Sequence, residues 1–137
     1  MMLTDKQKSS LVQAAAVARQ RAYAPYSKYL VGAAVLGASG RIYTAANVEN
    51  AAYPLTICAE RAAIFKAISE GERKFPAISV VSSNGGSPCG ACRQVMAEFG
   101  LDTLVLIATA EGAVVQESTV EELLPGAFGP QDLTPGE

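Results

Sequence analysis

The 137-residue sequence contains no histidine and only three cysteines, and each shortage excludes a class of site. An odd number of cysteines argues against a disulfide framework and fits a reducing compartment. Structural zinc centres are usually closed by four protein ligands. With neither a histidine nor a fourth cysteine in the sequence, this closed arrangement is not expected here.

Charge is also scarce, since 18% of the residues are charged and the net charge is −2 with no basic block. Tight binding to a phosphate backbone needs clustered lysine and arginine, so we expect no nucleic-acid polymer as a partner. No hydrophobic run is long enough to cross a bilayer, and the N-terminal residues lack the apolar core of a signal peptide. We therefore expect no membrane partner and a cytoplasmic location.

Half of the residues are hydrophobic, which is enough for one domain over residues 1–137 with a sizeable core. Thr4 with Gln7 predicts a capping box at the first helix. The hydrophobic spacing predicts helices over 5–23, 59–69, 91–99 and 120–124, and strands over 31–36, 41–48, 78–82, 104–108 and 113–117. This alternation favours a sheet with helices on both faces, the first two strands forming a hairpin. The polar tail, 129–137, is expected to be loose.

The three cysteines lie at the predicted starts of two helices. Cys58 opens the segment Cys-Ala-Glu-Arg, and Cys89 and Cys92 belong to Pro-Cys-Gly-Ala-Cys-Arg. A helix N-terminus carries partial positive charge, which lowers the pKa of a thiol and favours the thiolate that a metal needs. Cys89 and Cys92 share one face of a helical turn, and Cys58 approaches from the neighbouring helix. Three thiolates and one position left for water are typical of catalytic zinc.

Three charged residues adjoin these cysteines. Glu60 is placed to handle the proton of a zinc-activated water. Three thiolates and Zn²⁺ sum to a charge of −1, and we expect Arg61 and Arg93 to offset it through hydrogen bonds to sulfur. The alternative is that both arginines are merely solvated helix residues.

Cys-x-Glu followed by Pro-Cys-x-x-Cys is the signature of zinc deaminases in its all-cysteine form. Over most of its length the chain resembles the cytidine deaminases of the short, homotetrameric kind, with matching segments at 23–29, 31–34, 47–53, 58–61, 87–94 and 123–128. The resemblance implies an α/β fold, a three-layer α-β-α sandwich with a mixed five-stranded sheet. It also implies one Zn²⁺ per subunit, held by Cys58, Cys89 and Cys92, and a homotetramer with shared active sites.

The activity implied is the zinc-dependent hydrolytic deamination of cytidine and deoxycytidine, releasing ammonia in pyrimidine salvage. In that reaction Glu60 accepts a proton from the water that attacks C4 of cytosine. It then protonates N3 and the departing amino group. The backbone of Ala59 and Cys89 is expected to contact the edge of the pyrimidine.

The resemblance also assigns residues of the nucleoside pocket. Asn47 and Glu49 match the pair that binds the ribose 3′-hydroxyl, although a loop asparagine and a solvated glutamate are the plainer interpretation. Tyr29 stands beside the pyrimidine where the family commonly has phenylalanine, and its hydroxyl needs a partner or water. Phe128 and Tyr53 are expected to reach a neighbouring subunit's site, with core or interface packing as the alternative.

Three other functions compete with this interpretation. A blasticidin-type aminonucleoside deaminase shares the zinc segments but differs around the strand that carries Asn47 and Glu49. An editor of tRNA or polynucleotides usually has histidine as its first ligand and needs a basic path for the strand. A non-enzymatic zinc module predicts that Glu60 is dispensable.

Overall fold

A mixed five-stranded sheet forms the middle of the computed structural model, which describes residues 2–133. The strands have the order β2-β1-β3-β4-β5. They are β1 (Val31–Leu36), β2 (Ile42–Ala46), β3 (Ala77–Ser82), β4 (Leu104–Thr109) and β5 (Val114–Thr119). Only β3 and β4 pair in parallel; β1 pairs antiparallel with β2 and β3, and β4 with β5. The predicted hairpin of the first two strands is confirmed.

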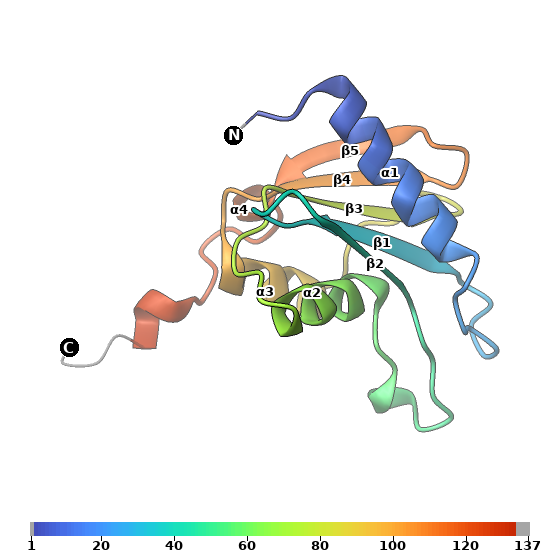
Figure 1. Cartoon of the computed structure of the whole chain (residues 1–137). Helices are drawn as coiled ribbons and strands as arrows, with labels where there is room; N and C mark the ends of the chain where they lie inside the picture. The colour runs from blue at the N-terminus through green and yellow to red at the C-terminus, as the bar shows by residue number, and fades with distance from the viewer. Residues whose placement is uncertain (1, 134–137) are drawn as a thin grey trace.

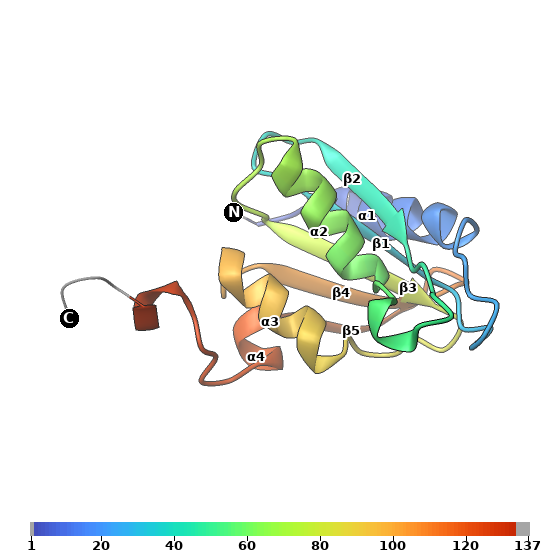
Figure 2. The same ribbon diagram turned by 90° about the horizontal axis from the view of Figure 1, so that it is seen from below.

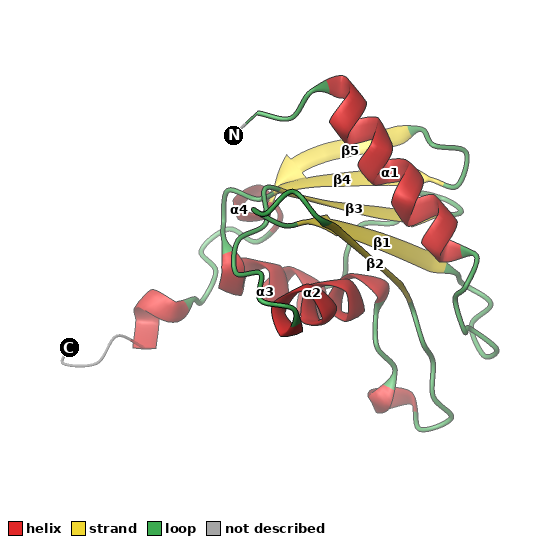
Figure 3. Cartoon of the chain, in the orientation of Figure 1, coloured by secondary structure: helices red, strands yellow, loops and turns green. Residues whose placement is uncertain are grey.

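Helices cover both faces of the sheet, as predicted (Figures 1 and 3). The long helix α1 (Asp5–Arg19) lies alone on one face. The opposite face carries α2 (Ala59–Ser69), α3 (Gly90–Phe99) and the short α4 (Val120–Leu123). A 3-10 turn, η1 (Tyr53–Leu55), lies in the loop before α2. The three-layer α-β-α sandwich is therefore confirmed.

The first helix begins as predicted and ends earlier than predicted. Thr4 and Gln7 form the expected capping box, with Gln7 N–H donating to the Thr4 hydroxyl at 3.1 Å and Thr4 N–H to the Gln7 side chain at 2.8 Å. The prediction of helix to residue 23 is wrong. Tyr23 donates its N–H to the carbonyl of Asn47 at 3.0 Å instead. This pairing with the chain beyond β2 replaces the hydrogen bond that would continue the helix.

The alternation of side chains along each strand divides the core into two clusters, one on each face. On β1, Ala33 and Val35 pack into the cluster beneath α2 and α3, whereas Ala34 and Leu36 pack into the cluster beneath α1. Gly32 lies on the α1 side, where a Cβ atom would come within 2.0 Å of the carbonyl oxygen of Ala15. The helix can approach β1 this closely only because Gly32 has no side chain.

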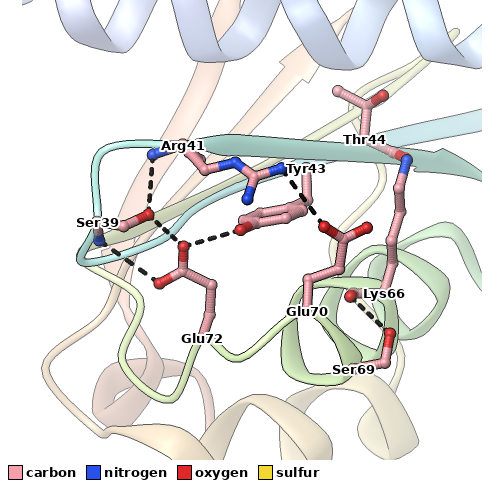
Figure 4. Close-up of polar contacts among 8 residues, drawn as sticks. All are labelled: Ser39, Arg41, Tyr43, Thr44, Lys66, Ser69, Glu70 and Glu72. Carbon is pink, nitrogen blue, oxygen red and sulfur yellow. Dashed lines mark hydrogen bonds and ion pairs between the residues drawn. The ribbon is translucent and has the colours of Figure 1, made fainter.

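A polar cluster ties the C-terminal end of α2 to the β1–β2 hairpin (Figure 4). Glu72 is 8% exposed and accepts hydrogen bonds from the hydroxyl groups of Ser39 and Tyr43, the latter at 2.9 Å. The Ser39 hydrogen bond is the main reason that the pKa of Glu72 lies below its ordinary value. Arg41 completes the cluster, with its guanidinium 5.2 Å from the Tyr43 ring centre and 3.4 Å from Glu70. The cluster fixes the far end of the helix that begins at Cys58.

The chain beyond α4 extends away from the sheet (Figure 2). Within the tail predicted to be loose, Pro130–Leu133 form the 3-10 helix η2, while residues 134–137 lie outside the described residues. A loose tail over 129–137 and a single domain over 1–137 both stay predictions. Each helix within residues 2–133 is too short or too polar to span a lipid bilayer.

Candidate active site

Two neighbouring helices present their N-termini to the same place. Cys58 is the N-cap residue of α2 and Cys89 that of α3, and neither side chain caps its helix by a hydrogen bond. Cys92 follows in the first turn of α3 and is fully buried. The two helices lie side by side on one face of the sheet (Figure 2). The predicted position of the cysteines at helix starts is thus what the structure has.

The three sulfur atoms converge to the spacing that a tetrahedral zinc ion requires. All three Sγ atoms lie within 4.8 Å of one another, with Cys58 to Cys89 at 4.0 Å and Cys89 to Cys92 at 3.5 Å. Zinc–sulfur bonds of about 2.3 Å at tetrahedral angles place ligand sulfurs about 3.8 Å apart. The cluster therefore fits zinc, and three ligands leave the fourth position for water.

The three thiols have unequal acidities. The pKa of Cys58 is lowered to about 5, first by the hydrogen bond from Cys92 and then by Arg61, whose Nη2 donates to Cys58 Sγ at 3.3 Å. The same hydrogen bond and burial raise the pKa of Cys92. A bound divalent cation reverses this second shift, because a coordinated thiol is deprotonated. Cys58 is accordingly the thiolate from which a metal site can assemble.

The second arginine, Arg93, holds backbone near the cysteines. Within residues 2–133 the guanidinium of Arg93 donates to the carbonyl oxygens of Pro88 at 2.8 Å and Leu123 at 2.7 Å, and to the hydroxyl of Ser87 at 2.7 Å. Each of the three guanidinium nitrogens thus donates to an oxygen atom, and the predicted hydrogen bond from Arg93 to a thiolate sulfur stays a prediction. Arg93 fixes the backbone next to Cys89 and ties it to α4.

Glu60 lies in the first turn of α2, two residues after Cys58, and is 5% exposed. Burial raises the pKa of its carboxyl group, and the charge of Cys58 acts in the same direction. A carboxyl group with a raised pKa exchanges protons near neutral pH more readily than an ordinary one. Ala59, between the two, is fully buried and shares the same wall of the site.

A cavity of about 260 Å³ opens onto Cys58 and Cys89. Most of the predicted site residues line it: Tyr29, Asn47, Glu49, Cys58, Ala59, Glu60 and Cys89. A larger hollow of about 420 Å³ lies between α1 and the β4–β5 hairpin, away from the cysteines. Of its four charged residues, Lys8 and Glu117 form an ion pair at 2.9 Å, and the other two are the carboxylates Asp5 and Glu111. The smaller cavity is therefore the candidate active site.

Asn47 and Glu49 both line the cavity but differ in their freedom to bind a ligand. Asn47 is buried, and its amide accepts from Val31 N–H at 2.9 Å and donates to the Tyr29 carbonyl at 2.9 Å. This amide holds the start of β1 and the segment that carries Tyr29. One N–H of Asn47 remains for a ligand, because the amide nitrogen has two hydrogens.

Glu49 is held by Tyr26 and Ser27, two loop residues for which the sequence predicts no role of their own. Its carboxylate accepts from the backbone N–H of Tyr26 at 3.0 Å and of Ser27 at 3.2 Å, and from the Ser27 hydroxyl. The Ser27 hydrogen bond is the main cause of the lowered pKa of Glu49. Ser27 lies within the matching segment 23–29, but hydroxyls in loops are too common for position alone to have identified it.

Tyr53 and Phe128 lie outside the set of described residues that line the cavity. Tyr53 is 70% exposed in the loop before α2, where its ring meets that of Tyr26 edge to face at 5.8 Å. Phe128 is 55% exposed on the segment that leaves the body of the fold, and its carbonyl accepts from Gln94 at 2.8 Å. Neither aromatic side chain is buried as core within its own subunit, which leaves the predicted intersubunit roles open.

Comparisons with known proteins agree with this geometry. Residues 5–108 match the family model described as the cytidine and deoxycytidylate deaminase zinc-binding region. A cytidine deaminase of Sporosarcina psychrophila is 52% identical over 85% of this chain and 88% of its own length. That of Halalkalibacterium halodurans is 52% identical over 90% of this chain and 95% of its own. The crystal structure of a cytidine deaminase from Burkholderia pseudomallei superimposes with a TM-score of 0.84 and 44% identity, covering 92% of this chain and all of that one.

The family model covers most of the chain, and the matched range includes all three cysteines and Glu60. The two relatives and the solved structure are similar over nearly their whole lengths. The chain belongs to the zinc-binding cytidine and deoxycytidylate deaminase family.

Proposed function

We propose that the protein is a zinc-dependent cytidine deaminase that hydrolyses cytidine and deoxycytidine to uridine and deoxyuridine with release of ammonia. The observation that carries this proposal is the convergence of three cysteine sulfurs within 4.8 Å at a cavity that Glu60 also lines. A structural zinc module has no use for an open coordination position beside a buried carboxyl group. The relatives named cytidine deaminase support the same activity.

The three cysteines and Glu60 have separate roles in this reaction. Zinc held by Cys58, Cys89 and Cys92 would supply the Lewis acidity that lowers the pKa of a coordinated water. Glu60 accepts one proton as this water adds to C4 and delivers it to N3 of the cytosine ring; it then accepts the second proton, from the hydroxyl group now on C4, and passes it to the departing amino group. Its raised pKa suits both directions of transfer. One carboxyl group therefore serves several steps.

The remainder of the cavity holds the nucleoside. Glu49 accepts a hydrogen bond from the ribose 3′-hydroxyl, and the free N–H of Asn47 donates to the same sugar. The ring of Tyr29 packs against the pyrimidine, while the backbone of Ala59 and Cys89 contacts its polar edge. The lowered pKa of Glu49 supports its role, because an ionised carboxylate is a strong acceptor.

A homotetramer with shared active sites is the assembly that we propose. The exposed aromatic side chains of Tyr53 and Phe128 support it, since large apolar groups at 70% and 55% exposure gain from burial against another subunit. Phe128 lies between α4 and η2, outside the regular elements of its own fold, where it can reach a neighbour. We further propose a cytoplasmic enzyme of pyrimidine salvage, because three unpaired cysteines need a reducing compartment.

Substrate comparison tests this proposal. Purified, zinc-loaded protein should consume cytidine, followed by the loss of the cytosine absorbance, much faster than blasticidin S or cytosine in an oligonucleotide. Chelation of the metal should abolish the reaction, and added zinc should restore it. Consumption of blasticidin S with cytidine untouched would reverse the choice, and an oligonucleotide deaminated faster than cytidine would contradict the exclusion of polynucleotides.

A further inference from the structure

The hydroxyl group of Tyr29 is held by the segment that leads from β3 to Cys89. Its oxygen donates to Oδ1 of Asn84 at 2.7 Å. The Tyr29 side chain lines the cavity beside Glu60 and Cys89, whereas Asn84 lies outside the described cavity lining. A residue outside the cavity therefore holds the far end of an aromatic side chain inside it.

The same asparagine oxygen links Tyr29 to the rest of the loop. Ser82, the last residue of β3, is 1% exposed and donates its hydroxyl to Asn84 Oδ1 at 3.3 Å. The Ser82 oxygen in turn accepts the N–H of Gly86 at 3.0 Å. In both of these hydrogen bonds the Asn84 side chain is the acceptor. Replacement by aspartate therefore keeps the acceptor oxygen, and replacement by alanine removes it.

Gly86 makes room for the Tyr29 hydroxyl. A Cβ atom at Gly86 would lie 2.6 Å from that oxygen, but 3.6 Å from Asn84 Oδ1 and 3.8 Å from Cζ of the Tyr29 ring. The last two distances are ordinary van der Waals contacts. Gly86 does not have the positive φ of its neighbour Gly85, so its backbone accepts alanine. The hydroxyl of Tyr29 is thus the atom that a side chain at residue 86 would displace.

We propose that Asn84 and Gly86 are positioning residues that form a seat for the Tyr29 hydroxyl and so fix the aromatic wall of the nucleoside cavity. The proposal rests on the proposed function, in which that wall packs against the pyrimidine. A wall that touches the base in the ground state and the transition state alike affects binding and leaves the chemical step unchanged. The seat therefore acts on KM and on the affinity for nucleoside.

Steady-state kinetics of the zinc-loaded enzyme with cytidine, and calorimetric binding of uridine, test the hydrogen bond. Tyr29→Phe and Asn84→Ala should each raise KM and the uridine Kd about 3- to 10-fold while kcat stays within about twofold, which corresponds to the loss of one hydrogen bond. The double variant should be no worse than Asn84→Ala alone, because Asn84→Ala already removes the bond that Tyr29→Phe removes. Asn84→Asp keeps the acceptor and should behave as wild type.

Gly86→Ala tests the contact between residue 86 and the Tyr29 hydroxyl, because in this variant Tyr29→Phe should lower KM, whereas in wild type it should raise KM. In the wild-type background the added methyl group should displace the Tyr29 ring and raise KM above that of Tyr29→Phe. Adding Tyr29→Phe to Gly86→Ala should lower KM again, to the value of Tyr29→Phe alone. Tyr43→Phe removes a hydroxyl from the cluster around Glu72 and is the matched control: it should lower Tm and leave KM unchanged.

Two results would overturn the seat. One is a Gly86→Ala defect that is equally large with and without the Tyr29 hydroxyl. The other is an Asn84→Asp variant as impaired as Asn84→Ala. If the zinc-loaded wild type turns over cytidine and the variants give either result, only the proposed role of Asn84 and Gly86 is overturned. If the zinc-loaded wild type fails to turn over cytidine, the proposed function itself is overturned.

Discussion

The guanidinium of Arg61 donates from Nη2 to Sγ of Cys58 across 3.3 Å, within the first turn of the same helix. The contact places a fixed positive charge beside three sulfurs that, as thiolates around Zn²⁺, would leave the site with a charge of −1. It contributes to the lowered pKa of Cys58, after the hydrogen bond from Cys92. Arg61 therefore supports the charged form of the ligand that a metal needs.

Replacing Arg61 with glutamine should weaken the metal site without unfolding the protein. Loss of a partner that hydrogen-bonds a metal ligand typically costs about 10- to 100-fold in metal affinity or activity. We expect a loss of this size both in zinc affinity, measured by competition with a chromogenic chelator, and in kcat/KM for cytidine. Arg21→Gln removes the same charge at an exposed position in the turn that follows α1 and is the control. Equal zinc affinity in Arg61→Gln and wild type would contradict the role of this contact.

Glu72 should make stability depend on pH. Its pKa in the folded protein lies below the ordinary value of 4.5, so the unfolded chain binds its proton first as the pH falls. The stabilisation is fully present above pH 4.5 and is lost as the pH falls through the lower, folded pKa. The free energy of unfolding, measured with urea from about pH 6 to about pH 3, should fall more steeply in wild type than in Glu72→Gln.

The control for this experiment is Glu70→Gln. Glu70 is a nearby carboxylate whose ion pair with Arg41, at 3.4 Å, is exposed to solvent. Exposed pairs contribute little to stability, so this variant should follow the wild-type pH dependence. Parallel curves for wild type and Glu72→Gln would show that the hydrogen bonds of Glu72 do not couple its ionisation to folding.

The close approach of α1 to the sheet predicts that Gly32→Ala is destabilising. The added methyl group would lie 2.0 Å from the Ala15 carbonyl oxygen, which belongs to a rigid helix backbone. Forcing one carbon into a packed core costs about 1–3 kcal/mol, and more when backbone must move. Gly90→Ala, at an open position in the first turn of α3, is the matched control and should change the unfolding free energy by less than about 1 kcal/mol. Equal denaturation midpoints for the two variants would contradict this account.

Much of the fold could be predicted from the sequence because local rules and tertiary packing agree. β1 and α2 have their predicted bounds, since hydrophobic spacing and flanking turn residues mark both. The convergence of the cysteines followed from spacing as well: Cys89 and Cys92 are three residues apart, and each segment begins a helix. The predicted and observed structures differ where a residue distant in sequence takes a hydrogen bond that the local pattern assigns to a helix. The carbonyl of Asn47 takes the N–H of Tyr23, and no helix pattern contains that information.

The same limit applies to the site. The expectation for Arg93 rested on its place next to Cys92, and no local pattern predicts that the carbonyl of Leu123, 30 residues further along, accepts from its guanidinium. Glu72 and its partners Ser39 and Tyr43 are about as far apart in sequence. Residues that act through long-range hydrogen bonds carry no local signal, whereas metal ligands reveal themselves by residue type and spacing.

Mixed oligomers test whether Phe128 completes a neighbouring subunit's site. Phe128→Ala should impair nucleoside binding at the adjacent site, and Glu60→Gln should inactivate its own. In co-assembled subunits a Glu60→Gln subunit would supply Phe128 to the intact zinc site of a Phe128→Ala subunit. Cytidine turnover should therefore reappear on mixing and reassembly. Activity that stays at the sum of the two separate variants would place Phe128 within its own subunit's structure.

The most direct test of the central claim is the paired measurement of zinc content and cytidine turnover in Glu60→Gln. We expect one zinc per subunit, as in wild type, because the proposed ligands are the three cysteines and not Glu60. We also expect a loss of turnover larger than the about 10²–10⁴-fold typical of a single general base, because one carboxyl group serves several proton transfers. A variant that binds zinc and keeps a tenth of wild-type activity would contradict the account.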